Sequence, residues 1–239
     1  MDLISGEIIG IDKPLGWTSF DAVKRLRGAV QRRLQVKKFK VGHAGTLDPL
    51  ATGVLIVCTG RATKEIERLQ SGSKEYVADI RLGATTPSFD LETEIDAEYP
   101  WEHITINKIE EILPRFRGKV MQVPPVFSAV KVDGKRAYNY ARKGKEVELK
   151  AKPLEISELE VLSFEAPVLR LRIVCSKGTY IRALARDIGE ALESGGHLIG
   201  LRRTRVGEMT IDKCLSVEEA LEKISTDPLE FPEYYQIKK

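Results

Sequence analysis

The sequence predicts an α+β fold, with a mixed, largely antiparallel sheet flanked by helices and loops. Strand-like and helix-like segments are interspersed along its 239 residues, and several consecutive strands are spaced as hairpins would be. Hydrophobic residues make up 42% of the chain, which is enough to bury a substantial core. This pattern favours an α+β domain over a doubly wound parallel sheet.

The N-terminal part is expected to contain a strand, a helix, a loop and a second strand. The short apolar run Glu7–Asp12 ends at a Lys-Pro pair, which is typical of a strand followed by a turn. Thr18 and Asp21 form a plausible capping pair for a helix. Helical spacing then continues in the apolar residues Ala22, Val23, Leu26, Val30 and Leu34. Glycine and proline interrupt Phe39–Ala51, a predicted loop, and Val54–Thr59 is predicted to be a buried strand.

The remaining elements follow from the same patterns. Lys74–Leu82 alternates between two faces, with Tyr76 on the apolar one, and predicts a strand. Thr105–Leu113 has helical spacing and stops at Pro114. Residues 130–142 suggest a strand, a tight turn and a short helix. Two strands, a helix, a strand and a short amphipathic helix are then predicted at Leu154–Phe164, Val168–Cys175, Thr179–Leu192, His197–Met209 and Ser216–Ile224.

Charge is segregated along the chain, although the net charge is only +3. Residues 22–47 contain no acidic residue and eight basic ones: Lys24, Arg25, Arg27, Arg32, Arg33, Lys37, Lys38 and Lys40. A second basic cluster consists of Arg202, Arg203 and Arg205, whereas acidic residues gather between positions 90 and 98. This segregation predicts a basic face that attracts nucleic acid. For the first cluster, an ordinary solvated helix face is the alternative.

Cysteine and histidine give no sign of a metal site. The three cysteines, Cys58, Cys175 and Cys214, are far apart, and the three histidines are equally scattered. We therefore expect no metal and no disulfide framework. The sequence shows no signal-peptide pattern and no apolar run as long as a membrane span. We expect a cytoplasmic protein with reduced thiols and no membrane association.

The segment Gly42–Gly53 is the most unusual in the chain. It places three glycines around His43 and Asp48, between a basic segment and a buried strand. A loop anchored in this way can hold a carboxylate rigidly at the edge of a cleft. In the alternative interpretation, Asp48-Pro49 simply starts a β-turn in which the Asp side chain bonds to nearby backbone. The segment is not a phosphate-binding loop, because it lacks the Gly-Lys-Ser/Thr ending.

A second segment with possible function is Gly178–Arg182, which opens a predicted helix. An arginine in the first turn is unfavourable for the helix dipole, so we expect Arg182 to have a specific partner. A guanidinium beside a buried carboxylate would keep that carboxylate ionised. The alternative is a surface arginine at a frayed helix end. For Tyr76, packing in the core is the default interpretation.

Taken together, these segments resemble the TruB family of tRNA pseudouridine synthases, which act on the uridine at position 55 in the T loop. The resemblance extends from about Gly6 to Met209. Its motifs are EIIGIDKP at 7–14, GHAGTLDPLATGVL at 42–55, KEYVADIRLG at 74–83, GTYIRALARDIG at 178–189 and HLIGLRRTRVG at 197–207. Several long motifs in the right order argue against a chance match.

The resemblance implies roles for individual residues. Asp48 would be the catalytic aspartate, Tyr76 the aromatic residue against the target base, and Arg182 the arginine that pairs with the aspartate. Tyr180 and Leu201 would line the pocket, and His43 would contact the flipped-out region of the T loop. Asp90 would lie near the arginine, although its segment departs from the commoner Thr-Asp-Thr form of the family.

The resemblance also implies an organisation. Residues 1–213 would form the catalytic domain, with a thumb-like insertion at about 126–152 that closes on the RNA. Residues 214–239 would form a short helix and a tail, too few for the PUA-like C-terminal domain of many bacterial members. The expected partner is tRNA, bound through its T stem-loop. We expect a monomer that needs no cofactor, no metal and no obligate protein partner.

Two other functions remain open at this point. A non-catalytic RNA-binding module could keep the same basic surface, although Asp48, Tyr76 and Arg182 are all present. A carboxylate-dependent glycosidase could use Asp48 and Asp90 as its pair of carboxylates. Whether Asp48 attacks the sugar or the base is not decided by the sequence.

Overall fold

The structure is a computed structural model, and it divides the chain into two compact units. The residues that it describes are 2–3, 5–128, 130–132, 134–141 and 147–229. The first unit contains residues 1–74 and 202–239, and the second contains residues 75–201. The predicted thumb at about 126–152 belongs to the second unit and lies partly outside the described residues.

The central strand of the sheet in the first unit is β3 (Ala51–Thr59), which is rich in apolar residues. β1 (Ile8–Lys13) and β2 (Val41–Ala44) both pair with β3 in antiparallel fashion. In the strand order, β3 lies between β1 and β12 (Gly196–Val206), which in turn pairs with β13 (Met209–Thr210). Residues 202–206 of β12 belong to this unit, and its first six residues belong to the second unit. Almost all side chains of β3 are buried because both of its faces are covered: Leu55 and Val57 pack in one hydrophobic cluster, and Val54, Ile56 and Cys58 pack in another.

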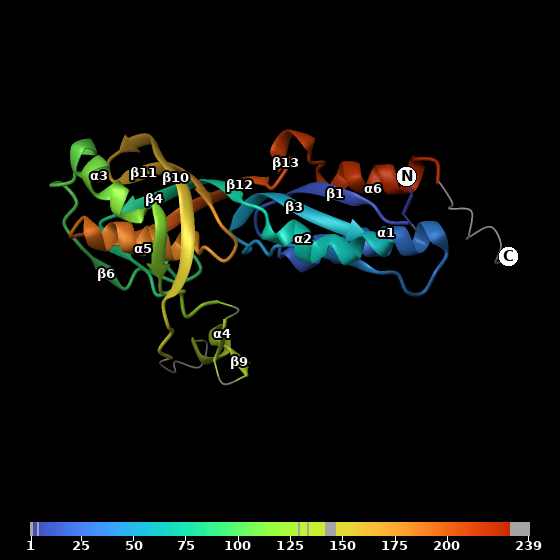
Figure 1. Cartoon of the computed structure of the whole chain (residues 1–239), viewed down its shortest axis with the longest axis horizontal. Coiled ribbons are helices and arrows are strands. Elements are labelled where there is room, and N and C mark those ends of the chain that lie inside the picture. Colours follow the sequence, from blue (N-terminus) through green and yellow to red (C-terminus); the bar gives the residue numbers. More distant parts are fainter. Residues whose placement is uncertain (1, 4, 129, 133, 142–146, 230–239) are drawn as a thin grey trace. The chain divides into compact units, whose positions relative to one another are not determined.

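Two capped helices complete the core of the first unit. α1 (Ser19–Leu34) begins with the predicted capping box, in which the Thr18 hydroxyl accepts a bond from the Asp21 N–H at 3.0 Å. α6 (Val217–Thr226) begins with a second capping box at Ser216. Figure 1 shows both helices beside β1 and β3. Their apolar faces share one core, whose members include Ala22, Val23, Leu26, Val30, Val217, Ala220 and Ile224.

The prediction of one continuous loop over Phe39–Ala51 is wrong at β2. Val41 and Ala44 are buried, and the main chain between them pairs with β3 from Thr59 to Ile56. Four residues that include a glycine and a histidine are too few to show the alternation that identifies a strand. The short helical segments η1 (Gly60–Glu65), α2 (Ile66–Ser71) and η3 (Ile211–Lys213) complete this unit.

The second unit contains a strand order of β4, β11, β10 and β7, with β12 as the other neighbour of β4. The bounds are Lys74–Leu82 for β4, Val168–Cys175 for β11, Lys152–Glu165 for β10 and Gly118–Gln122 for β7. β10 pairs antiparallel with both β11 and β7. β7 was not predicted, and it ends the strand order of this unit.

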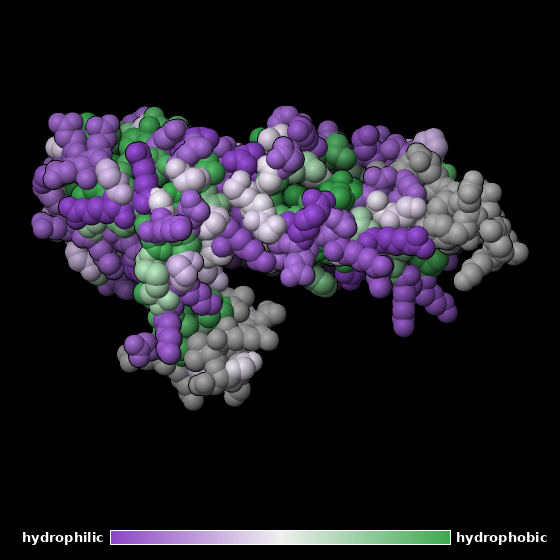
Figure 2. All heavy atoms as spheres, viewed as in Figure 1, coloured by the Kyte–Doolittle hydropathy of each residue, from purple (hydrophilic) through white to green (hydrophobic). Residues whose placement is uncertain are grey.

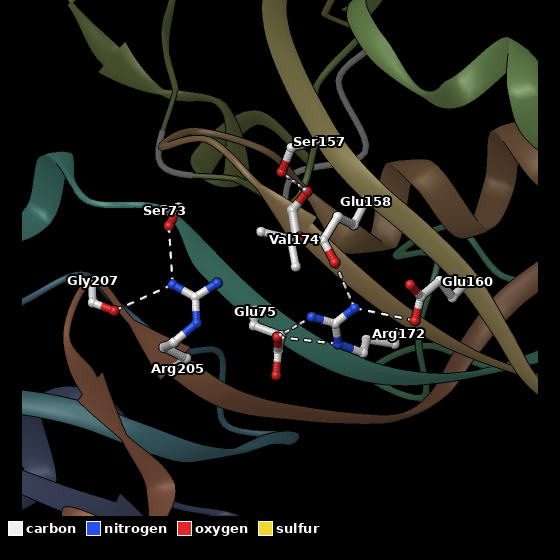
Figure 3. Close-up of polar contacts among 9 residues, drawn as sticks. All are labelled: Ser73, Glu75, Ser157, Glu158, Glu160, Arg172, Val174, Arg205 and Gly207. Carbon is white, nitrogen blue, oxygen red and sulfur yellow. Dashed lines mark hydrogen bonds and ion pairs between the residues drawn. The ribbon is translucent and has the colours of Figure 1, made fainter.

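An arginine cluster ties three of these strands together on one face (Figure 3). Arg172 of β11 donates to Glu75 of β4 at 2.7 Å, to Glu158 of β10 at 2.6 Å and to Glu160 of β10 at 3.1 Å. Alternation along each strand places the four side chains on the same face of the sheet. Because they are partly exposed, each pair contributes little to stability, about 0–1 kcal/mol.

Helices and short pairs complete the second unit. α5 (Ile181–Ala191) buries most of its first eight residues, and α3 (Ile106–Ile112) runs into the short helix η2 (Leu113–Phe116) at Pro114. The smaller elements are β5 (Ala84–Thr85), β6 (Ala97–Glu98), β8 (Lys131–Val132), β9 (Lys135–Arg136) and α4 (Ala137–Ala141).

The α+β fold with a largely antiparallel sheet is confirmed. Every strand pair named above whose direction is given is antiparallel, as are β5 with β6 and β8 with β9. Within the part of the chain that the structure describes, none of the helices combines the length and the apolar character needed to cross a bilayer.

Candidate active site

The loop that carries Asp48 is held by a fully buried arginine. Arg203 on β12 is only 1% exposed. Its Nε donates to the carbonyl of Val54 at 2.8 Å, and its Nη2 donates to the carbonyl of Gly45 at 3.0 Å. A longer contact of 3.4 Å reaches the carbonyl of Thr46. One side chain therefore fixes the main chain before and after the half-buried Asp48.

A second set of anchors holds the two residues that flank Asp48. The Ser19 hydroxyl, at the start of α1, accepts a bond from the Leu47 N–H at 2.8 Å and donates to the Leu47 carbonyl at 3.2 Å. On the other side, the Pro49 carbonyl accepts a bond from the Gly16 N–H at 2.9 Å. The main chain on both sides of Asp48 is thus tied to the segment that leads into α1.

The third anchor is a fully buried lysine. Lys13, at the end of β1, is 0% exposed. Its ammonium donates to the carbonyls of Trp17 at 2.6 Å and Pro14 at 3.0 Å, and it lies 3.5 Å from the carbonyl of Pro49. Burial lowers the pKa of Lys13 to about 8, while the charge of Asp48 acts against that shift. The lysine is therefore close enough to Asp48 for the two charges to interact.

The glycines of the loop are explained by the same arginine. Gly53 has a φ of +100°, which residues with a side chain rarely adopt. A Cβ at this position would lie 2.1 Å from the carbonyl oxygen of Arg203. Gly45 also has a positive φ, of 94°. The loop can approach β12 so closely at Gly53 only because this position carries no side chain, whereas a Cβ at Gly45 would lie 3.7 Å from Nη1 of Arg203, an ordinary contact.

His43 on β2 is kept uncharged by its surroundings. Burial lowers the pKa of His43, and the nearby charge of Arg203 lowers it further. Its Nδ1 is buried and has no hydrogen-bond partner among the described residues. A neutral imidazole at this position can pack against a base without bringing a buried charge.

In the second unit, Arg182 on α5 has the specific partners that its unfavourable place in the first turn predicted. Its Nη1 donates to the carbonyl of Ser88 at 3.2 Å and its Nη2 to the carbonyl of Phe127 at 2.9 Å. Its Nε lies 3.6 Å from Oδ2 of Asp90. The two side chains are only 7% and 8% exposed. The implied proximity of Asp90 to the arginine is therefore found in the structure.

Asp90 sits in a loop with its own hydrogen bonds. Its Oδ1 accepts a bond from the Glu92 N–H at 3.0 Å. The Asp90 carbonyl accepts bonds from the hydroxyls of Thr86 at 2.7 Å and Ser88 at 3.2 Å. This network holds the carboxylate toward the guanidinium of Arg182.

The other expected residues of the second unit lie on its strands and at the start of α5. Tyr76 on β4 is 8% exposed. Tyr180 immediately precedes α5, and the side chain of the buried Gln122 bonds to both its N–H, at 2.9 Å, and its carbonyl, at 3.1 Å. Leu201 on β12 is half-buried. Asp48 and His43 belong to the first unit, so their relation to these residues stays a prediction.

The basic surface is only partly where the sequence placed it. Seven of the eight basic residues between 22 and 47 are exposed, and only Arg27 is half-buried, where it donates to the carbonyl of Val41. Figure 2, which colours residues by hydropathy, shows hydrophilic residues interspersed with hydrophobic patches on the visible surface of each unit. The second cluster, in contrast, does not form a basic surface. Arg203 is buried, and Arg202 is paired with Asp12 at 2.7 Å.

Arg205, the third member of that cluster, is also engaged. Its Nη1 donates to the Ser73 hydroxyl at 3.1 Å and to the Gly207 carbonyl at 3.2 Å (Figure 3). Charge counting along the sequence cannot distinguish such internal arginines from solvated ones. Lys13 and Arg203 lie in motifs that the sequence analysis quoted, and Ser19 lies between the predicted capping residues Thr18 and Asp21, but none of the three was predicted to anchor the loop. Gln122 gave no signal in the sequence.

The described residues offer no obvious metal site. No group of three or more His, Cys, Asp or Glu side chains among them is arranged to hold a metal ion.

Comparison with known proteins places these features in a family. Residues 31–181 match the family described as TruB family pseudouridylate synthase (N terminal domain), and residues 182–228 match the tRNA pseudouridylate synthase B C-terminal domain. A protein of Parabacteroides distasonis named tRNA pseudouridine synthase B is 66% identical over 92% of this chain and 93% of its own length. One of the same name from Phocaeicola vulgatus is 62% identical over 96% of this chain and 98% of its own length.

A solved structure shares the fold at lower identity. In the crystal structure of a Cbf5-Nop10-Gar1 complex, one chain superposes with a TM-score of 0.70 at 29% identity. The superposition covers 99% of this chain but only 60% of that longer chain.

Proposed function

Because the chain belongs to the TruB family of pseudouridylate synthases, we propose that it isomerises uridine to pseudouridine in tRNA, at position 55 of the T loop. The observation that carries this proposal is the 66% identity with a tRNA pseudouridine synthase B along nearly the whole of both chains. The rigid loop around Asp48 supports it, since a reacting carboxylate must be held in one place.

In the proposed mechanism, Asp48 is the nucleophile. The reaction breaks the bond between uracil N1 and the ribose, turns the base, and joins the ribose to C5. A covalent intermediate on a carboxylate divides this difficult step into two easier ones. The anchors of the loop suit the role, because Arg203, Ser19 and Lys13 bind its main chain. The carboxylate can then change its bonding without loosening the loop.

Tyr76 and Arg182 are proposed to act on the same uridine. A uridine stacked in a folded loop must first be turned outward, at a cost of a few kcal/mol. Stacking on one aromatic ring can return about 1–3 kcal/mol, which is the role proposed for Tyr76. Arg182 would keep Asp48 ionised, and Tyr180 and Leu201 would line the pocket. His43, which is neutral, would fill the space that the base leaves.

Attraction of the RNA is assigned to the exposed basic residues of the first unit. Seven exposed lysines and arginines lie between residues 22 and 47. Such contacts with phosphate do not depend on sequence and weaken steeply as salt rises. Selection of the T loop would come from the shape of the RNA and from its splayed bases. Residues 1–213 would supply the catalytic residues, and about 126–152 would close on the RNA.

The experiment that tests the function uses an unmodified tRNA transcript labelled with tritium at uridine C5. Formation of pseudouridine replaces that hydrogen by the ribose bond, so tritium is released to water. We expect release of about one equivalent per tRNA and none from a transcript with cytidine at position 55. Binding without release would leave only an RNA-binding module. Release that persists in the cytidine transcript would show that another uridine is the target.

A further inference from the structure

The second unit has a cavity whose lining residues are not among those assigned to the uridine site. It has a volume of about 440 Å³, within the usual range of ligand sites. It is lined by η2, by β7 and the residue after it, by Ile156 of β10 and by α5 between Leu184 and Asp187. All of these elements belong to the second unit, so the cavity is a feature of that unit alone.

Part of the wall is apolar and exposed to solvent. Met121 is 64% exposed and Val123 is 40% exposed, and both line the cavity with Phe116. Exposed apolar side chains that gather around a concavity are typical of a binding site, whereas scattered ones are not. A flat ring that stacks on these three side chains would remove them from water.

The polar part of the wall is an arginine-aspartate pair held in a fixed geometry. Arg186 donates from Nε and Nη2 to Oδ1 of Asp187, at 2.8 and 2.6 Å, and from Nη2 to the carbonyl of Val123 at 3.2 Å. Its guanidinium also lies 4.8 Å from the centre of the Phe89 ring. Burial raises the pKa of Asp187, and the charge of Arg186 acts against that shift.

In this pair, one donor group of Arg186 and one acceptor atom of Asp187 can still bond to a ligand. Within the described part of the chain, neither Nη1 of Arg186 nor Oδ2 of Asp187 has a hydrogen-bond partner, and neither is a fully buried atom. A donor beside an acceptor is complementary to the edge of a nucleobase, which carries both. A simple anion would not suit the site as well, because Asp187 would repel it.

The charge balance of the lining favours a phosphate-bearing ligand. Arg115 and Lys119, both exposed, line the cavity together with Arg186, and these three cations face two carboxylates, that of Asp187 in the lining and that of Glu190, which lies 3.9 Å from Nε of Arg186. Addition of a peptide strand to β7 is less well supported. The Val123 carbonyl is already bound by Arg186, and Pro124 and Pro125, which follow, have no N–H to pair.

We propose that this cavity binds one unpaired nucleotide of the RNA substrate, away from the uridine that reacts. The base stacks on Met121 and Val123, its edge bonds to Arg186 and Asp187, and its phosphate lies near Lys119. The proposal rests on the proposed function in one respect, namely that the ligand is RNA.

The first test compares matched charge changes at exposed positions. Met121→Glu places a carboxylate in the cavity, whereas Leu162→Glu changes a 49% exposed residue of β10 outside the lining. We expect Met121→Glu to raise the Kd for an unmodified tRNA transcript by about tenfold or more, and Leu162→Glu by less than about twofold. Lys119→Glu and Lys108→Glu form a second pair with the same expectation. Equal effects within both pairs would overturn the proposal.

The second test identifies the ligand directly. A photoreactive benzoylphenylalanine replaces Met121 in the full chain, and the purified protein is irradiated with the tRNA transcript. We expect a crosslink to one unpaired nucleotide other than the target uridine. No crosslink to RNA, or crosslinks spread evenly along it, would overturn the proposal. Both tests measure binding, so they can fail while tritium release is normal, and a protein that binds but releases no tritium would contradict only the proposed function.

Discussion

The loop that carries Asp48 and the loop that carries Asp90 are held in different ways. In the first unit, the anchors Arg203, Ser19 and Lys13 come from outside the loop and bind its main chain. In the second unit, the carboxylate of Asp90 is itself one of the groups that bind the buried arginine of α5.

The difference predicts how each loop responds when the charge of its carboxylate changes. Asp90 is part of a buried ion pair, so a change in its charge would disturb the loop around it. The bonds of Arg203 and Ser19 to the other loop do not involve the Asp48 carboxylate, because they bind carbonyl and N–H groups of the main chain, whereas Lys13 also senses the charge of Asp48 through its pKa. A carboxylate that forms and breaks a covalent bond needs a support like that of the Asp48 loop, in which side chains from outside the loop hold its main chain.

The largest loss of stability is expected where the Asp48 loop approaches β12. Gly53→Ala would place a Cβ 2.1 Å from the Arg203 carbonyl oxygen, and we expect a loss of more than about 4 kcal/mol in the free energy of unfolding. Gly16→Ala is the matched control, since Gly16 also has a positive φ but nothing lies within 4 Å of its Cβ position. There we expect a loss of about 1 kcal/mol. Equal losses in urea denaturation would show that close approach is not what fixes the loop.

Removal of the Asp90 carboxylate is expected to cost nearly as much. Asp90→Ala removes the buried carboxylate that faces the 7% exposed side chain of Arg182, and we expect a loss of about 3–5 kcal/mol. Asp79→Ala, which breaks the more exposed pair with Arg170, should cost less than about 1 kcal/mol. The contrast between the two loops would not hold if both changes were equally mild in chemical denaturation.

Arg203 should matter through its hydrogen bonds to carbonyl groups. Arg203→Met keeps the apolar stem but leaves the Gly45 and Val54 carbonyls without their donor, and we expect a loss of about 2–4 kcal/mol. Its neighbour Arg202, which is 43% exposed and paired with Asp12, provides the control. Arg202→Met should cost less than about 1 kcal/mol. If thermal and urea unfolding rank the two variants in the opposite order, the role given to Arg203 is wrong.

The smallest effect concerns His43 and pH. Burial and Arg203 lower the pKa of His43 in the folded chain below its ordinary value of 6.5. As pH falls below 6.5, the unfolded chain therefore takes up a proton before the folded chain does, and stability is lost. We expect His43→Gln to lose less stability than the unaltered protein between pH 7 and about pH 5. Parallel stability curves in urea would contradict the lowered pKa of the half-buried His43.

The regular elements could be predicted because each repeats one pattern several times. The capping pair Thr18 and Asp21, followed by apolar residues at helical spacing, correctly predicted α1. The alternation in Lys74–Leu82 predicted β4 with its bounds. β2 and β7 were missed, since strands of four and five residues are defined by their neighbours rather than by their own pattern.

The site could be predicted only in part. The family motifs directed attention to Asp48 and Arg182, and the unfavourable position of Arg182 in its helix correctly predicted a specific partner. The anchors were not predicted, because Arg203 in the sequence is one of three similar arginines and only the fold shows that it is buried. A pattern of charges records residue types, whereas the function of a charge depends on which groups surround it.

The most direct test of the central claim replaces the Asp48 carboxylate by an amide. Asp48→Asn should reduce the rate of tritium release from the labelled tRNA transcript by about 10³-fold or more, while the Kd for tRNA and the free energy of unfolding stay close to those of the unaltered protein. Asp212→Asn, at an exposed position of the same unit, should leave all three quantities unchanged. A rate for Asp48→Asn within about tenfold of the unaltered protein would contradict the assignment of Asp48 as the nucleophile.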